Sequence, residues 1–238
     1  MACFTLEEVL AATHGKVVQG QSGKVHFTEV STDSRKIQDA NLFIALQGEV
    51  FDGHDYVAQA VASGATGVII SRNDINLPST GTFILVQNTI TALQDLARFH
   101  RQRFNDISVI AITGSNGKTT TKDMISSVLA TRFNVLKTEA NFNNEIGLPQ
   151  TILRLNNQHE VVVVEMGMRG LGQIRELAEI ALPTLAVLTN VGETHIELLG
   201  SVENIAKAKA ELVQFLRPDG VAILNGDNKY VRNMNQET

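Results

Sequence analysis

The stretch of sequence on which the fold depends runs Ile107-Ser108-Val109-Ile110-Ala111-Ile112-Thr113-Gly114-Ser115-Asn116-Gly117-Lys118-Thr119-Thr120. Its mostly apolar beginning predicts a buried strand, and the residues from Lys118 to Ala130 predict a helix. Between them, Gly114 and Gly117 allow a tight backbone turn that points N–H groups at an anion. The positive end of the following helix adds to this attraction. The stretch therefore predicts a phosphate-binding loop.

The residue types of the loop match this chemistry. Lys118 has the reach to contact the β- and γ-phosphates of a nucleotide, and the Thr119 hydroxyl suits Mg²⁺. The pattern G-x-x-x-x-G-K-[ST] is not met, because Ile112 stands where its first glycine belongs. A glycine turn with a chance Gly-Lys-Thr is the alternative, but the strand before and the helix after favour phosphate binding. The predicted nucleotide-binding residues are Gly114, Ser115, Asn116, Gly117, Lys118, Thr119 and Thr120.

Strands and helices alternate on both sides of this loop. Residues 161–164 are consecutive valines, as a strand buried on both faces requires. Alternation of this kind predicts parallel strands in a doubly wound sheet, which binds ligands at the carboxyl ends of its strands. Strands are predicted at 107–112, 133–136, 161–165, 185–189 and 221–224, and helices at 118–130, 148–153, 171–181 and 202–216.

The chain before the loop has a different organisation. Residues 1–88 predict a small α/β domain, with strands at 41–46, 67–71 and 82–86 and a helix that carries the apolar stripe Tyr56, Val57, Ala60 and Val61. Residues 89–104 predict an amphipathic connecting helix, and residues 105–238 form the phosphate-loop domain. The fold class is therefore α/β, with a small N-terminal α/β domain followed by a doubly wound, mainly parallel sheet.

Composition excludes several classes of protein. The net charge of −5 and the pI of about 5.7 argue against nucleic-acid binding, which needs a basic surface. No apolar run has the length of a membrane span. The single cysteine, Cys3, excludes an internal disulfide and a cysteine-rich metal site. We expect a cytoplasmic, monomeric protein.

Further polar residues follow the other predicted strand ends. Glu165 ends the valine-rich strand, where it is either a second Mg²⁺ ligand or an exposed strand-end charge. His195 follows strand 185–189 and is either a ligand or a structural histidine. Lys207 and Lys209 lie on the next helix, where lysine is ordinarily solvated. Asn143 and Asn144 belong to an asparagine-rich loop that serves either as a turn or as a source of amide donors.

Taken together, these motifs resemble those of the Mur ligase family over essentially the whole chain. The phosphate loop shares with that family the lack of the first glycine. The remaining motifs that carry the resemblance are Thr32–Lys36, Leu42–Leu46, Phe51–His54, Thr138–Pro149, Glu165–Met168 and Asn190–His195.

The resemblance implies a function and a set of residue roles. The resemblance is strongest to the branch that adds D-alanyl-D-alanine to UDP-N-acetylmuramoyl-tripeptide in peptidoglycan precursor synthesis. It implies that the reaction uses ATP and Mg²⁺ and passes through an acyl phosphate. Thr119, Glu165, His195 and Lys209 become metal ligands, and Lys118, His195 and Lys209 catalytic residues. Lys209, followed by Glu211 in the pattern A-K-x-E, falls where the family carries a lysine carbamylated by CO₂. Ser34 and Arg35 would bind the UDP end of the precursor in domain 1–88, and Asn143 and Asn144 the substrate.

The domain organisation of the family leads to further expectations, and two alternatives to this assignment remain open. Family members continue into a C-terminal domain, so we expect the central domain 105–238 to be incomplete, that further domain to be absent, and this chain alone to be inactive. One alternative is another Mur-type or folylpolyglutamate-type amino-acid ligase. The other is a phosphate-loop nucleotide-binding module without ligase activity, which would not need His195 and Lys209.

Overall fold

The computed structural model describes residues 2–21, 23–48 and 51–236. The chain divides into two compact units, Met1–His100 and Arg101–Thr238, and the boundary falls inside helix α3 (Thr89–Gln102). No helix in these described ranges is long and apolar enough to cross a membrane.

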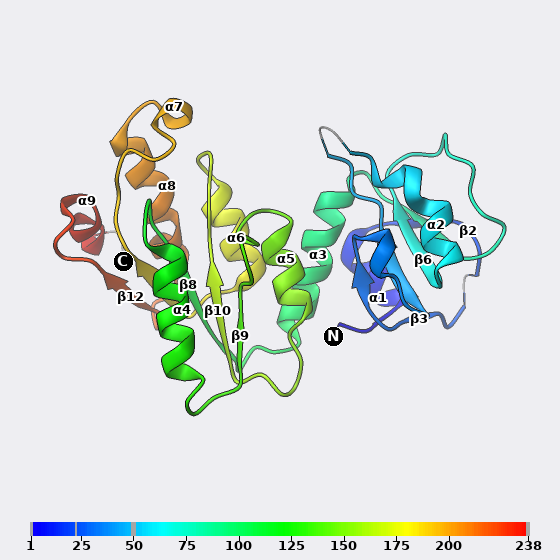
Figure 1. Ribbon diagram of the computed structural model, residues 1–238, viewed down its shortest axis with the longest axis horizontal. Helices are drawn as coiled ribbons and strands as arrows, with labels where there is room; N and C mark the ends of the chain where they lie inside the picture. Colours follow the sequence, from blue (N-terminus) through cyan, green and yellow to red (C-terminus); the bar gives the residue numbers. More distant parts are fainter. Residues whose placement is uncertain (1, 22, 49–50, 237–238) are drawn as a thin grey trace. The chain divides into compact units, whose positions relative to one another are not determined.

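The first unit is built on a five-stranded sheet with the order β2-β7-β6-β5-β4. Figure 1 shows helix α2 beside strand β6 of this sheet. Strands β4 to β7 are parallel, and β2 pairs with β7 in antiparallel fashion. The predicted strands 41–46, 67–71 and 82–86 are confirmed as β5, β6 and β7. The elements are β1 (Phe4–Thr5), α1 (Leu6–Thr13), β2 (Lys16–Gln19), β3 (His26–Phe27), β4 (Val30–Ser31), η1 (Ser34–Lys36), β5 (Asn41–Ile44), η2 (Gly53–Tyr56), α2 (Val57–Ala62), β6 (Ala65–Ile70), β7 (Thr82–Leu85) and α3.

The core of this unit lies between α2 and the sheet. Phe43, Val68 and Phe83 come from three neighbouring strands and pack with Val57 and Ala60 of α2, all nearly inaccessible to solvent. Of the predicted apolar stripe, Val57 and Ala60 form the buried face of α2 and Val61 is partly buried, whereas Tyr56 lies in the preceding 3₁₀ turn η2 and is exposed. Strands β1 to β4 escaped prediction because two to four residues are too few to display a period.

The second unit has a five-stranded sheet in which every pair of neighbours is parallel, with the order β12-β11-β8-β10-β9. The doubly wound parallel sheet predicted from the sequence is confirmed. The elements are β8 (Ser108–Thr113), α4 (Lys118–Leu129), β9 (Val135–Lys137), α5 (Gly147–Leu153), β10 (Val161–Glu165), α6 (Gln173–Ala181), β11 (Leu185–Leu188), α7 (Ile196–Leu199), α8 (Val202–Phe215), β12 (Val221–Leu224), α9 (Lys229–Arg232) and η3 (Asn233–Gln236).

The strand order brings three loops together. The chain passes from β8 to β9 and β10 on one side and then to β11 and β12 on the other, so β8 lies between β10 and β11. The carboxyl ends of β8, β10 and β11 are therefore adjacent, which is the topological switch point at which such sheets bind ligands. Each of these ends carries a motif that the sequence analysis identified.

Side-chain alternation decides which face of the sheet each residue meets. Val161 and Val163 of β10 belong to the core cluster that includes Ile125 of α4. Glu165 lies two residues beyond Val163, so it projects from the same face, toward α4. A buried carboxylate is thereby directed at the helix that follows the phosphate loop.

The side chain of Arg101 connects the end of α6 with the segment that precedes β8, and it is only 2% exposed. Its guanidinium donates hydrogen bonds to the carbonyl oxygens of Ala181 (2.9 Å), Ile107 (3.1 Å) and Leu182 (3.4 Å), and also to that of Phe104. Burial lowers its pKa, with the charge of Arg217 as a smaller contribution. One side chain thus satisfies carbonyls at the end of α6 and just before β8.

Arg101→Ala is expected to lower the free energy of unfolding by about 3 kcal/mol, because it leaves several buried carbonyl oxygens without a donor. The measurement is urea unfolding of both proteins. Arg232→Ala, at an exposed arginine of α9, is the control and should cost less than about 0.5 kcal/mol. A loss below 1 kcal/mol for Arg101→Ala would show that water replaces the guanidinium.

Candidate functional site

The phosphate loop adopts the backbone conformation that its glycines allow. Gly114 has φ +153° and Gly117 has φ +80°, and Gly117 is the N-cap of α4. A Cβ atom on Gly114 would lie 1.9 Å from the Thr189 hydroxyl oxygen, so no other residue fits there. Gly117 has open space around it, and its requirement is the positive φ alone.

The end of β11 holds this loop in place. The backbone N–H groups of Ser115 and Asn116 donate to the carbonyl and side-chain oxygens of Asn190, both at 2.9 Å. The Thr189 hydroxyl donates to the Asn116 carbonyl at 2.6 Å. The backbone N–H groups of Ser115 and Asn116 are therefore occupied by hydrogen bonds that shape the loop. The N–H groups of the first turn of α4 are left to face an anion, because a helix offers them no internal acceptor.

Lys118 provides the cation beside these amides. Its Nζ donates to the carbonyl oxygen of Gly114 at 2.8 Å and lies 3.4 Å from that of Ser115, so the side chain folds back across the loop. Burial lowers the pKa of Lys118, while the nearby Glu165 carboxylate acts in the opposite direction. The ammonium group is thus fixed at the mouth of the loop.

Glu165 is buried rather than an exposed strand-end charge, since its exposure is 3%. Its Oε2 accepts a hydrogen bond from the Thr119 hydroxyl at 2.8 Å, and its Oε1 accepts one from the Asn143 amide at 2.7 Å. The carboxylate therefore joins the phosphate loop to the asparagine-rich loop that follows β9.

Two supporting residues escaped the sequence analysis. The Thr138 hydroxyl accepts the backbone N–H of Glu165 at 3.0 Å, and the Nζ of buried Lys122 donates to the Thr138 carbonyl at 3.0 Å. Thr138 had a usable signal, because it directly follows strand β9. Lys122 had none, because a lysine on a helix is ordinarily solvated.

A cleft of about 430 Å³ opens beside this cluster. Among its lining residues are Lys118, Asn143, Asn144, His195 and Lys209, all predicted as site residues from the sequence. Lys207 is exposed and does not line it. The lining residues not predicted as site residues are Asn141, Glu145, Gly167, Met168, Arg169 and Gln173.

Lys209 has the most perturbed environment in this cleft. It is 3% exposed, and burial lowers its pKa to about 7, with the charge of Lys118 as the second cause. About half of such amines are neutral near pH 7, and a neutral amine is a nucleophile whereas an ammonium ion is not. Lys209 is therefore equipped to react with a small electrophile.

The other predicted residues of the cleft, His195, Asn143 and Asn144, differ in burial and in hydrogen-bond partners. His195 is half-buried with φ +68°, at the residue before the short helix α7. The Asn144 side-chain oxygen accepts the backbone N–H of Gly147 at 2.9 Å and so begins helix α5. Turn chemistry thus accounts for Asn144, while Asn143 donates to Glu165.

The predicted metal ligands are Thr119, Glu165, His195 and Lys209. Thr119 and Glu165 are in contact, and His195 and Lys209 line the neighbouring cleft. No group of three or more His, Cys, Asp or Glu side chains suited to a metal occurs in the part of the chain that the structure describes. The protein oxygens present, a hydroxyl and a carboxylate, are hard donors of the kind that Mg²⁺ prefers, and Mg²⁺ normally keeps water or phosphate ligands as well.

The first unit carries Ser34 and Arg35 at a separate pocket of about 480 Å³. Arg35 is paired with Asp33, at 2.9 Å between Nε and Oδ1, and this pairing holds the pKa of Asp33 at about 2. Phe51 and Tyr56 stack at the same pocket, with ring centroids 4.9 Å apart. The pocket thus combines a flat aromatic surface with a charged group, although the Arg35 guanidinium already donates hydrogen bonds to both carboxylate oxygens of Asp33.

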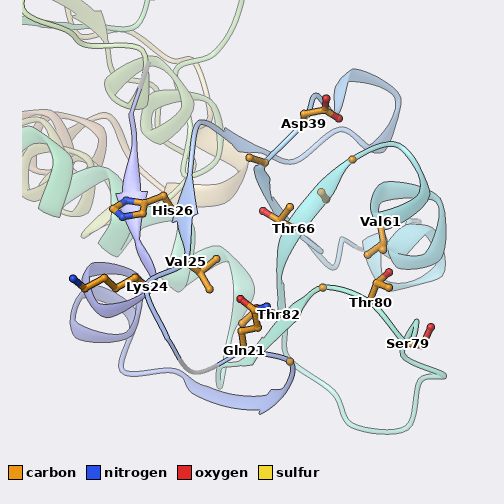
Figure 2. Close-up of a pocket in the computed structure, with 15 residues that line it drawn as sticks. Gln21, Lys24, Val25, His26, Asp39, Val61, Thr66, Ser79, Thr80 and Thr82 are labelled. Atoms are coloured by element: carbon orange, nitrogen blue, oxygen red, sulfur yellow. The ribbon is translucent and has the colours of Figure 1, made fainter.

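A larger cavity of about 880 Å³ lies elsewhere in the first unit, and none of the predicted site residues lines it (Figure 2). Figure 2 shows Lys24 and His26 at one side of it and Ser79 and Thr80 at the other. Its lining includes Gly64 and Gly81, which directly precede β6 and β7. It therefore lies at the amino ends of the parallel strands, the opposite end from the one at which such sheets bind ligands.

Comparison with known proteins agrees with the motifs. The family model described as Mur ligase middle domain matches residues 112–238, and the model described as Mur ligase family, catalytic domain, matches residues 26–101. A crystal structure of MurF from Acinetobacter baumannii superposes with a TM-score of 0.92 at 33% identity, covering 100% of this chain and 52% of that one. A structure of MurF ligase from Thermotoga maritima in complex with ADP gives 0.79 at 34% identity, covering 86% and 47%.

Curated relatives give the same result. The UDP-N-acetylmuramoyl-tripeptide–D-alanyl-D-alanine ligase of Bacillus subtilis (strain 168) is 45% identical over 229 residues, which are 96% of this chain and 50% of the relative. The ligase of that name from Escherichia coli (strain K12) is 38% identical over 229 residues, 96% and 49%. The chain spans about half the length of the curated relatives it matches. Because the middle-domain model alone covers more than half of it, the chain belongs to the Mur ligase family.

Proposed function

We propose that this chain carries the ATP site and the UDP-precursor site of a ligase that adds D-alanyl-D-alanine to UDP-N-acetylmuramoyl-tripeptide. One observation carries the proposal: Lys118, His195 and Lys209 line one cleft, beside the hydrogen bond between Thr119 and the buried Glu165. A nucleotide-binding module would need the phosphate loop but not the other residues. The names of the relatives and the ADP in the Thermotoga maritima complex support the choice of substrates.

The proposed reaction has two steps. The terminal carboxylate of the tripeptide attacks the γ-phosphorus of ATP, forming an acyl phosphate and releasing ADP. The amine of D-alanyl-D-alanine then attacks the acyl carbon, loses a proton and expels phosphate, forming the amide. Lys118 and the first turn of α4 hold the phosphates and stabilise the charge that develops on the transferred group. Catalysis then consists of positioning and electrostatics.

The remaining site residues are assigned by their chemistry. Thr119 and Glu165, with His195 and a carbamylated Lys209, would hold Mg²⁺, which when bound offsets the charge of the phosphates. The Lys209 carbamate forms when the neutral amine attacks CO₂ and loses a proton, which converts a cation into an anion. A buried lysine with a pKa of about 7 is suited to this step, because its amine is neutral without strong alkali.

The test of the function has a binding arm and a ligation arm. Calorimetry on this chain measures the affinities for ATP, ADP and UDP-N-acetylmuramoyl-tripeptide. Ligation is measured as ADP formation by a fusion that continues this chain with the second half of the Bacillus subtilis relative. We expect ADP formation that depends on both the tripeptide precursor and D-alanyl-D-alanine. A chain that binds neither ATP nor the precursor, or a fusion that prefers glutamate and a folate, would contradict the proposal.

Lys118→Ala is expected to lower ATP-dependent turnover of the fusion by at least about 100-fold, because the loop loses the cation beside the transferred phosphate. Folding should be retained, since Lys118 contacts only loop carbonyls. Lys207→Ala, an exposed lysine, is the control and should keep the wild-type rate. A Lys118→Ala rate above about a tenth of wild type would speak against the assignment.

Carbamylation of Lys209 should depend on pH in a defined direction. At fixed dissolved CO₂ the carbamate should increase as the pH rises through about 7, the pKa of the buried amine, because only the neutral amine reacts. An ordinary lysine would need a pH nearer 10. Carbon-13 NMR with labelled CO₂ measures the carbamate. Lys209→Ala should lose the signal and Lys207→Ala should keep it; a signal that persists without Lys209 would refute the assignment.

Arg35→Ala is expected to weaken binding of the UDP-linked precursor by about tenfold, since a charge-assisted hydrogen bond to a phosphate typically contributes about 1.5 kcal/mol or more. Lys36→Ala, at the exposed neighbour, is the control. Calorimetry on this chain gives both affinities. An unchanged affinity for Arg35→Ala would indicate that Arg35 stays paired with Asp33 when the precursor binds.

A further inference from the structure

We infer that Glu211 is a positioning residue for the cleft, and that it acts through the loop between β10 and α6 rather than on a substrate. The inference rests on the proposed function of the cleft. Glu211 lies on α8, two residues after Lys209, and it is 8% exposed. Residues two apart on a helix point about 200° away from each other. Lys209 therefore faces the cleft while Glu211 faces another element.

That element is the beginning of helix α6. Glu211 Oε1 accepts the backbone N–H of Gly172 at 2.7 Å, and its Oε2 accepts that of Arg175 at 3.1 Å. The N-cap of α6 is Gly172, which has no side chain to cap the helix. The Glu211 carboxylate supplies the missing acceptor from a distant part of the chain, and its negative charge lies at the positive end of α6.

The loop that this contact holds forms one wall of the cleft. In this loop Met166 and Met168 are buried, whereas residues 169–172 comprise two glycines and the exposed Arg169 and Leu171, so few side chains restrain the backbone of this second half. Gly167, Met168 and Arg169 of this loop line the cleft, as does Gln173 at the start of α6. Gln173 Oε1 accepts the N–H groups of Arg169 (2.6 Å) and Gly170 (3.2 Å). Glu211 and Gln173 together fix this wall against the helix that carries Lys209.

The same contacts exclude a direct chemical role for Glu211. Both carboxylate oxygens accept backbone N–H groups, and Glu211 does not line the cleft. A carboxylate held in this way is poorly placed to take a proton from a substrate or to ligate a cation. The glutamate of the A-K-x-E pattern thus sets the distance between the Lys209 side chain and the opposite wall. Misplacement of a catalytic group by about 1 Å can cost about 100-fold in rate.

The test compares kinetic constants of the ligase fusion at a temperature where each variant is folded. Glu211→Ala should lower kcat by about 10- to 100-fold, the range typical for residues that orient catalytic groups. The KM for ATP should stay within about twofold, because the contacts that hold the phosphate loop do not involve Glu211. Glu211→Gln should lie between Glu211→Ala and the wild type, because its amide oxygen accepts one of the two N–H groups. Glu203→Gln, on the same helix and bonded to Tyr230, is the control and should be unchanged.

Each result decides the inference. A Glu211→Ala enzyme with wild-type kcat and only a lower melting temperature would overturn the inference, because a residue with a purely structural role changes the stability of the protein and not its kcat. If Glu211→Ala does not fold, Glu211→Gln applies the same criterion, and an unchanged kcat overturns the inference. Failure of the proposed function is distinguishable, because then the wild-type fusion forms no ADP, or Lys209→Ala retains the wild-type rate.

Discussion

The candidate site in the second unit depends on a buried negative charge. Burying a carboxylate is costly unless hydrogen-bond donors or a cation compensate it. Glu165 receives donors from Thr119 on α4 and from Asn143 on the loop after β9, while its own backbone is held by Thr138. The two donors come from separate segments, α4 and the loop after β9, so the carboxylate can be satisfied only when the strand order of the sheet is already in place. The same arrangement leaves one carboxylate beside the phosphate loop, at the position proposed for Mg²⁺.

Charge and burial then set the properties of the lysines around this carboxylate. Lys118 and Lys209 both have lowered pKa values, in each case mainly because burial disfavours the charged form. Glu165 opposes the shift at Lys118, whereas Lys118 itself adds to the shift at Lys209. Lysines that look alike in the sequence therefore acquire different roles. Lys118 keeps a carboxylate close by, which favours its charged form, whereas burial leaves about half of the Lys209 amines neutral near pH 7.

Long-range side-chain contacts, rather than the loops themselves, hold the cleft together. The phosphate loop gives its own amides to Asn190, and the glycine-rich loop after β10 is fixed by Gln173 and Glu211. Loops rich in glycine lose more conformational entropy on folding than others, so such external contacts are what makes a defined wall possible. In the first unit, Asp33 and Arg35 pair within a single turn, and this local contact shapes the rim of the smaller pocket.

The sequence by itself determined the class of the fold, the parallel sheet of the second unit and the family. Consecutive valines, glycines at a strand end and a helix beginning at Lys118 are local signals, and together they favour a phosphate loop at the end of a buried strand. It also placed Lys118, Asn143 and His195 at one edge of the sheet, because parallel strands bring their carboxyl ends together, and the family resemblance added Lys209; all four line one cleft. Short strands such as β3 and β4, and the single-turn helices α7 and α9, were missed because they contain too few residues to show a period.

Only the tertiary structure decided how individual polar side chains are used. Periodicity and composition left Glu165 as either a ligand or an exposed charge and Lys209 as an ordinary solvated lysine, and only the family resemblance assigned both to a metal site. Glu211 was noted only as part of the A-K-x-E pattern. Burial and hydrogen-bond partners separate these possibilities, and both depend on residues distant in the chain, such as Gly172 for Glu211 and Thr119 for Glu165. Periodicity and composition report which face a residue occupies; they carry no information about which distant donor lies opposite it. That is set by the packing of α4, α6 and α8 on the sheet.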